Sequence, residues 1–383
     1  MPTHSMYVYP WDLRDEGVCE VAARLRDASI DSVSVATSYH AGKFLRPHGP
    51  QGKVYFPEDG TVYFRPSANR YRVLAPQQAR MAREYDALSE LSRHAPDLGV
   101  TAWTVGLHNS RLGAAHPDLA VETAFGDRLI NSLCPSQPEV RHFAKALCAD
   151  AASQPGVREV ALEAPGWQAF RHGHHHEFEL IELPDVVQIM LGTCFCTACL
   201  SRASAAGIDG DGLKRAARTD LEDYFHSGAA PVTDPKTDPD WVAYFHLRAE
   251  TVTSMASEIR AEMPFDATLA IIPTTQSPND LCWIEGSDLA GLASAADRIE
   301  IPAYQNGVAA ISSDATRAAR AAGNDAALGF ILRPTYPNLA GAEDVTRAVE
   351  ALRALRPTSI SFYNYGHMRL ESLDWIAAAL TAS

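Results

Sequence analysis

Three cysteines, Cys194, Cys196 and Cys199, fall within one run of six residues, a spacing typical of metal ligands. Thiolates this close can share one tetrahedral ion when a fourth ligand comes from elsewhere in the chain. Cys134 is the best candidate for that ligand, so the pattern predicts a four-cysteine zinc site, with four free thiols as the alternative. Because four thiolates leave a tetrahedral ion no open position, we expect a structural role. The other three are expected to be single buried thiols: Cys19, Cys148 and Cys282.

Glu163 follows a short apolar run and is the candidate for a catalytic proton donor. Hydrolysis of a glycoside needs two carboxyl groups, of which one donates a proton and the other attacks or activates water. The alternative role of Glu163 is a structural ion pair at a strand end. For the second carboxyl group there are three candidates, Glu177, Glu300 and Asp12, and Asp12 could instead hold a sugar hydroxyl.

A histidine-rich segment at 171–179 reads Arg-His-Gly-His-His-His-Glu-Phe-Glu. Its side chains could bind a metal, move protons or hydrogen-bond sugar hydroxyls, and the alternative is a solvated polar loop. The spacing differs from that of the helical His-Glu-x-x-His motif, which excludes a zincin site. We expect His174, His175 and His176 to contact the substrate.

Eight short apolar runs predict the strands of a parallel sheet, at 6–10, 32–36, 101–107, 159–162, 268–272, 298–301, 328–332 and 359–362. Helical spacing of apolar residues alternates with them, at 18–25, 76–92, 138–152, 312–322, 342–355 and 370–380. Eight strands alternating with helices predict a single (β/α)₈ barrel domain over residues 1–383. An open doubly wound sheet is the competing fold, but neither glycine-rich nucleotide motif is present, so we expect no organic cofactor.

Two long loops follow strands 2 and 4, at 41–75 and 164–262, and the second holds the cysteine run and the histidine-rich segment. Both leave the carboxyl ends of strands, where the active sites of such barrels lie. Aromatic and polar residues gather at these same ends, a mixture that suits sugar rings and their hydroxyls. The predicted substrate-binding residues, besides the three histidines, are Trp11, Asp12, Tyr39, His40, His108, Asn109, Trp167, Tyr304, Gln305, Arg333, Tyr363 and Asn364.

The layout of Cys134, the Pro-x-x-Pro-x-x-Arg run after it, Glu163 and the cysteine triplet resembles the zinc site of family 42 β-galactosidases. More broadly it is similar to the (β/α)₈ glycoside hydrolases of the same clan. The resemblance implies that Glu163 is the general acid, although Leu162 stands where the family has an asparagine. It also implies a nucleophilic glutamate at the end of strand 7, where this sequence has Arg333.

The composition limits the remaining function classes. The chain has 383 residues, a net charge of −14 and 46% hydrophobic residues, which excludes a mainly disordered chain and argues against nucleic-acid binding. No apolar run reaches the length of a membrane helix, and the first residues lack the pattern of a secretion signal, so we expect a cytoplasmic protein.

A glycoside hydrolase acting on a small carbohydrate or glycoside is therefore the leading hypothesis. A metal-dependent sugar isomerase or epimerase, with histidine and glutamate ligands, is the first alternative. A carbohydrate-binding barrel without catalytic activity is the second, and the missing strand-7 glutamate favours it. The sequence makes no prediction of the oligomeric state.

Overall fold

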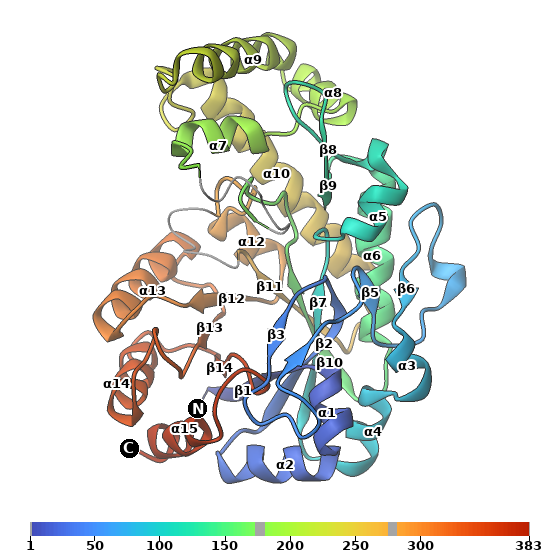
Figure 1. Cartoon of the computed structure of the whole chain (residues 1–383), viewed down its shortest axis with the longest axis vertical. Coiled ribbons are helices and arrows are strands. Elements are labelled where there is room, and N and C mark those ends of the chain that lie inside the picture. Colours follow the sequence, from blue (N-terminus) through green and yellow to red (C-terminus); the bar gives the residue numbers. More distant parts are fainter. Residues whose placement is uncertain (1, 173–180, 275–281, 383) are drawn as a thin grey trace.

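The computed structural model describes residues 2–172, 181–274 and 282–382. Eight parallel strands close into a barrel, because β1 pairs with both β2 and β14 (Figure 1). In chain order the barrel strands are β1 (Thr3–Val8), β2 (Ser32–Tyr39), β7 (Gly99–Val105), β10 (Val157–Glu163), β11 (Thr268–Ile272), β12 (Arg298–Ala303), β13 (Leu328–Leu332) and β14 (Ser359–Phe362). The predicted (β/α)₈ fold is confirmed, with long loops after the second and fourth strands.

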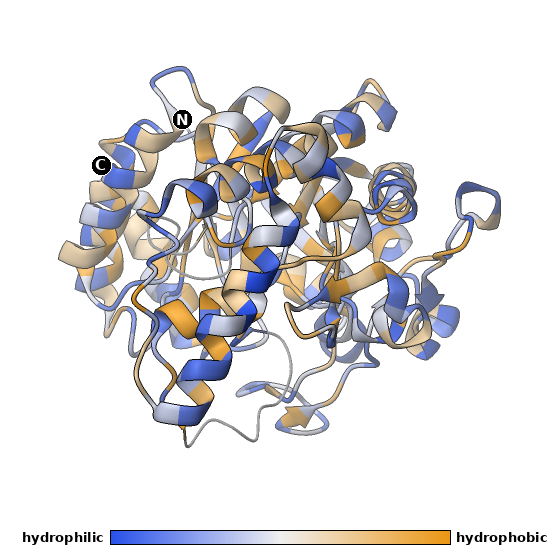
Figure 2. Cartoon of the chain, turned by 90° about the horizontal axis from the view of Figure 1, so that it is seen from above, coloured by the Kyte–Doolittle hydropathy of each residue, from blue (hydrophilic) through white to orange (hydrophobic). Residues whose placement is uncertain are grey.

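Helices surround the barrel and bury apolar residues against it, and hydrophilic and hydrophobic residues are interspersed along many of the helices in Figure 2. The surrounding helices are α1 (Pro10–Glu16), α2 (Val18–Asp27), α3 (Arg80–Glu84), α4 (Ala87–His94), α6 (Pro138–Ala152), α10 (Pro239–Glu262), α12 (Leu289–Ala295), α13 (Val308–Ala322), α14 (Ala342–Arg353) and α15 (Glu371–Thr381). Among the described residues, no single helix is long and apolar enough to cross a membrane.

Two expectations about local structure were wrong. The single helix expected over 76–92 is two short helices, because Asp86 breaks the pattern and caps α4 by accepting a hydrogen bond from the backbone N–H of Ser89. Cys19 is exposed rather than buried, since it lies on the outer side of α2, whose buried residues are Val18, Val21, Ala22 and Leu25.

The long loops carry their own elements beside the barrel mouth. The segment between β2 and α3 holds β3 (Phe44–Leu45), β4 (Val54–Tyr55), β5 (Thr61–Val62), a 3-10 turn (Ala68–Arg70) and, just after the predicted loop, β6 (Gln77–Gln78). The loop after β7 holds α5 (Ser110–Ala115), a 3-10 turn (Pro117–Leu119) and the hairpin of β8 (Ala120–Glu122) and β9 (Arg128–Leu133). The insertion after β10 holds α7 (Asp185–Gly192), α8 (Thr197–Ala205) and α9 (Gly210–Ser227), which gather at one end of the molecule in Figure 1.

A buried ion pair fixes the first long loop to the barrel. The Arg46 guanidinium lies 3.2 Å from Asp12 and 2.7 Å from Asp15, both on α1. Arg46 and Asp12 are buried, so the charges are shielded from water and depend on each other. The pair thereby holds the 41–75 loop against the helix that follows β1.

Replacing Arg46 with methionine removes the cation and leaves the Asp12 carboxyl buried without it. We expect the free energy of unfolding in urea to fall by about 3–5 kcal/mol, as for other broken buried pairs. Arg26→Gln is the matched control, because Arg26 pairs with Asp97 at an exposed site, and its loss should be below about 1 kcal/mol. Equal losses in the two variants would contradict the role given to Arg46.

Candidate active site

A cavity of about 300 Å³ lies at the carboxyl ends of the barrel strands. Six of its lining residues are predicted site residues, and they come from five different strands or the segments that follow them: Tyr39, His40, Glu163, Tyr304, Arg333 and Tyr363. The other lining residues are Tyr7, His172, Ile272, Pro302 and Ile331. The structure thus brings together residues distant in the chain, such as Tyr39 and Tyr363, which are 324 positions apart.

Glu163 is the carboxyl group among these lining residues. It is the last residue of β10 and is only 9% exposed. The indole N–H of Trp103, on the neighbouring strand β7, donates a hydrogen bond of 2.6 Å to its Oε2 atom. Burial raises the pKa of Glu163 to about 7, although the Trp103 hydrogen bond and the positive charge of Arg333 both act to lower it.

Arg333 follows β13, at the strand-7 end where the family resemblance implies a glutamate. Its guanidinium carbon lies 3.6 Å from the ring centroid of Tyr304 and 5.2 Å from that of Tyr363. The flat cation therefore lies over an aromatic face, an arrangement that holds it in place.

Tyrosine hydroxyl groups form a hydrogen-bonded cluster next to the cavity. The Tyr9 hydroxyl lies 2.9 Å from that of Tyr363, 3.2 Å from that of Tyr39 and 3.4 Å from Nε2 of His367. Burial raises the pKa of Tyr9, so its hydroxyl stays neutral and can both donate and accept. Neither Tyr9 nor His367 was predicted as a site residue, because Tyr9 lies within the first apolar run and His367 within the last loop.

Three histidines line one side of the cavity or stand directly behind it. The His40 ring stacks on His108 with centroids 4.3 Å apart, and His108 contacts His172 edge to face at 5.2 Å. Burial lowers the pKa of His40, which favours a neutral ring. Asn109 has a structural contact instead: its side chain accepts a hydrogen bond from the backbone N–H of Leu112 and caps α5.

Several other predicted residues are held by the protein away from the cavity lining. Trp11 stacks between Tyr9 and Tyr55, at centroid distances of 4.4 and 4.7 Å. Asp12 pairs with Arg46, and burial raises its pKa to about 7. Trp167 lies beneath the Arg248 guanidinium at 4.3 Å.

Two more predicted binding residues have short-range partners. Gln305 donates a hydrogen bond from its side chain to Asp314, and Asn364 accepts one from the backbone N–H of Gly366 at 2.9 Å. His174, His175, His176 and Glu177 lie outside the described residues.

Glu300 points into the barrel but one layer below the cavity. It lies two residues before Pro302, which lines the cavity, so both face inward from β12. The carboxylate accepts a hydrogen bond from Ser361 and lies 3.3 Å from Arg298, which also pairs with Glu159. These contacts give Glu300 a place in an ion cluster at the amino-terminal half of the barrel.

Glu285 is a buried carboxyl group that the sequence reasoning missed. Burial raises its pKa to about 8, and the charge of Glu163 adds to this, while a hydrogen bond with Thr274 opposes it. Its backbone is fixed because Trp167 N–H donates to the Glu285 carbonyl at 3.1 Å, and a Cβ on Gly166 would come within 1.9 Å of that oxygen. No periodic pattern marks Glu285, since it lies in the turn after β11.

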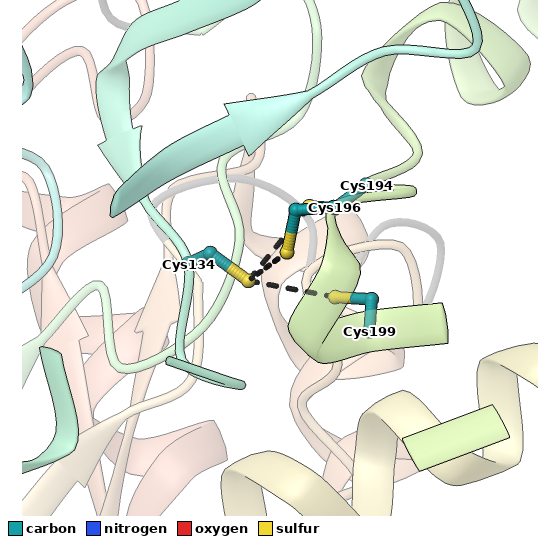
Figure 3. Close-up of side chains that lie close together, drawn as sticks. All are labelled: Cys134, Cys194, Cys196 and Cys199. Carbon is teal, nitrogen blue, oxygen red and sulfur yellow. Dashed lines mark hydrogen bonds between the residues drawn. The ribbon is translucent and has the colours of Figure 1, made fainter. Parts of the chain in front are cut away.

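Four buried cysteine sulfurs converge between the β8–β9 hairpin and the α7–α8 segment (Figure 3). The Cys134 sulfur lies 3.7 Å from those of Cys194 and Cys196 and 3.5 Å from that of Cys199. Zinc bonded to four sulfurs at about 2.3 Å would hold those sulfurs about 3.8 Å apart, so the arrangement fits a tetrahedral ion. In the described part of the chain this is the one group of three or more histidine, cysteine or acidic residues arranged to hold a metal.

Comparisons with known proteins show the fold. No protein-family model matches the chain, and no curated protein matches its sequence. The PgaB (BpsB) glycoside hydrolase domain from Bordetella bronchiseptica has a similar structure, with a TM-score of 0.60, 15% identity, and coverage of 95% of this chain and 94% of that one.

Two further solved structures share the fold. The β-amylase catalytic domain from Paenibacillus polymyxa has a TM-score of 0.55 and 10% identity, covering 99% of this chain and 97% of that one. The β-galactosidase from the psychrophilic Marinomonas ef1 has a TM-score of 0.53 and 12% identity, covering 99% of this chain and 59% of that one. At these identities the likeness shows the (β/α)₈ barrel fold alone, and the resemblance to family 42 stays a prediction.

Proposed function

We propose that this chain is a carbohydrate-active enzyme that cleaves a glycosidic bond in the cavity at the barrel mouth, with Glu163 as the proton donor. The observation that carries the proposal is a buried carboxyl group that lines a cavity and has a pKa of about 7. A general acid must hold its proton near the working pH and still be able to release it. The ring faces and hydroxyl groups of the tyrosines around Glu163 suit a sugar, and the names of the similar structures agree with that class.

The second carboxyl group of the reaction must act on the opposite face of the sugar. Asp12 and Glu300 are engaged with Arg46 and Arg298 away from the cavity lining, which leaves Glu177 as the proposed second group. The pKa of Glu285 is about 8 and that of Glu163 is about 7, so Glu285 is still protonated and neutral at every pH at which Glu163 holds its proton. We assign Glu285 the role of a neutral neighbour that adds no second negative charge beside Glu163.

Glu163→Gln should lower kcat/KM by roughly 10²–10⁴-fold, the usual contribution of general acid catalysis. Because the protonated form is the active one, the wild-type rate should fall as the pH rises through about 7. The measurement is the pH profile of hydrolysis over a panel of phenyl and dinitrophenyl glycosides. The loss in Glu163→Gln should be larger for the phenyl glycosides, whose poorer leaving group needs the proton more.

Glu285→Gln is the matched control, since glutamine has nearly the shape of protonated glutamate. It should keep most of the activity below pH 8, whereas Glu177→Gln should lose it. A Glu163→Gln variant as active as wild type on phenyl glycosides would contradict the proposal. Sugar binding without turnover in the wild type would favour a non-catalytic barrel, and chelator-sensitive isomerisation of a sugar would favour the isomerase.

Trp103→Phe tests the environment of Glu163 directly. Removing the indole N–H takes away a hydrogen bond that favours the ionised carboxylate, so the pKa of Glu163 should rise above about 7. The falling limb of the pH profile should move to higher pH by the same amount. An unchanged limb would mean that another group controls the rate.

We also infer that the four cysteines hold a structural zinc ion. Each sulfur is buried, and two have nearby donors that suit a thiolate: the backbone N–H of Glu122 points to Cys194 at 3.4 Å, and the Gln137 side chain points to Cys196 at 3.7 Å. The ion would tie the β8–β9 hairpin to α7 and α8 without offering an open position for substrate.

Metal analysis of the purified protein should find about one zinc per chain. Cys199→Ser should lose most of that zinc and unfold at a lower temperature, because the binding energy of a structural ion contributes to folding. Cys148→Ser is the control, since Cys148 is buried outside the cluster and should leave the zinc content unchanged. Less than about half an equivalent of zinc in the wild type would contradict the site.

A further inference from the structure

Arg333 brings a positive charge to the cavity and forms no ion pair with any carboxylate in the described part of the chain. Its Nε atom is buried, and no hydrogen-bond partner for it occurs among the described residues. Its side-chain contacts there are the ring faces of Tyr304 and Tyr363. Aromatic faces attract a cation, but they do not replace the hydrogen bonds that a guanidinium makes in water.

A second half-buried arginine, on a barrel strand, shows how the chain treats such a charge elsewhere. Arg298 lies in the amino-terminal half of the barrel and contacts two carboxylates, Glu159 and Glu300. At the mouth, Glu163 is the carboxyl group that lines the cavity together with Arg333 in the described part of the chain; the two form no ion pair, and Glu163 is neutral below its pKa of about 7. The cation at the mouth is therefore available for a ligand.

The net negative charge of the whole chain bears on how an anion could bind at Arg333. A net charge of −14 repels anions at long range, so an anionic ligand would be held only by a specific local contact. Arg333 is the one arginine or lysine among the described residues that line the cavity. The histidines that also line it, His40 and His172, both contact the buried ring of His108. The single guanidinium of Arg333 would neutralise a ligand that carries one negative charge.

We propose that the sugar bound in this cavity carries a carboxylate group, as a uronic acid does, and that Arg333 binds that carboxylate. The inference deepens the proposed function, because it names the substrate class for the same site.

Geometry and size favour a sugar acid over other anions. The planar guanidinium matches the two oxygens of a carboxylate, and the Tyr304 ring at 3.6 Å keeps its plane oriented. A cavity of about 300 Å³ is at the small end of ligand sites, which suits a single sugar unit. A doubly charged phosphate would bring an excess negative charge next to Glu163.

Binding is measured by calorimetry in the Glu163→Gln background, where turnover is blocked. The probes are glucuronic and galacturonic acids, with glucose and galactose as their neutral counterparts and glucose 6-phosphate as the second anion. We expect at least one sugar acid to bind about tenfold or more tightly than its neutral counterpart and than the phosphate, a difference of about 1.4 kcal/mol.

Adding Arg333→Gln should abolish that preference, and Arg333→Lys should keep part of it because the charge remains without the planar fork. Arg26→Gln is the matched control, since it removes one positive charge at an exposed pair with Asp97. The unfolding temperature of each variant shows whether it is folded. If Arg333→Gln does not fold, the reduced preference expected for Arg333→Lys tests the proposal instead.

Equal binding of acidic and neutral sugars, or tighter binding of the phosphate, would overturn the carboxylate assignment. The readout is separate from hydrolysis. A sugar acid that binds through Arg333 but is never cleaved when linked as an aryl glycoside would overturn the proposed function alone. Cleavage of neutral glycosides without any acid preference would overturn this inference alone.

Discussion

The filling of the barrel interior is the constraint on which the candidate site depends. Eight parallel strands leave a lumen that side chains must occupy, and near the mouth aromatic rings do so. Tyr7 meets Trp103 edge to face at 5.0 Å, Tyr39 meets Trp103 at 5.0 Å, and Tyr363 meets it at 5.7 Å. These rings exclude water from the carboxyl group at the end of β10, and the raised pKa of Glu163 follows from that exclusion.

The barrel separates its buried charges along its axis. The amino-terminal half holds Arg298 with Glu159 and Glu300, a cluster in which positive and negative groups neutralise one another. The mouth holds Glu163 and Arg333, which interact through their charges but form no ion pair. The cluster around Arg298 is neutralised within the protein and stabilises the barrel. At the mouth, Glu163 and Arg333 are not paired with each other, so both can contact a ligand. This contrast explains why Glu300, although it faces the lumen, is not part of the proposed reaction.

The sequence predicted what depends on local pattern. All eight barrel strands were expected, three with the bounds observed, because parallel strands buried on both faces read as short apolar runs. The cysteine cluster was predicted from the tight spacing after residue 193, and Glu163 from its place at a strand end. Glu285 and Tyr9 were missed, because no repeat marks the turn that holds Glu285, and Tyr9 looked like another apolar residue of the first strand. Their surroundings come from residues distant in sequence, Glu163 for Glu285 and Tyr363 for Tyr9.

The cysteine cluster and the cavity are connected through one strand. Cys134 directly follows β9, and Asn131 of the same strand donates a hydrogen bond of 2.9 Å from its side chain to the backbone carbonyl of His172. His172 in turn lines the cavity and contacts His108. An ion that fixes Cys134 would thus restrain β9. Through the hydrogen bond of Asn131, it would also restrain the backbone at His172, near the start of the histidine-rich segment. A metal with no position for substrate can in this way still help to shape the wall against which the substrate would bind.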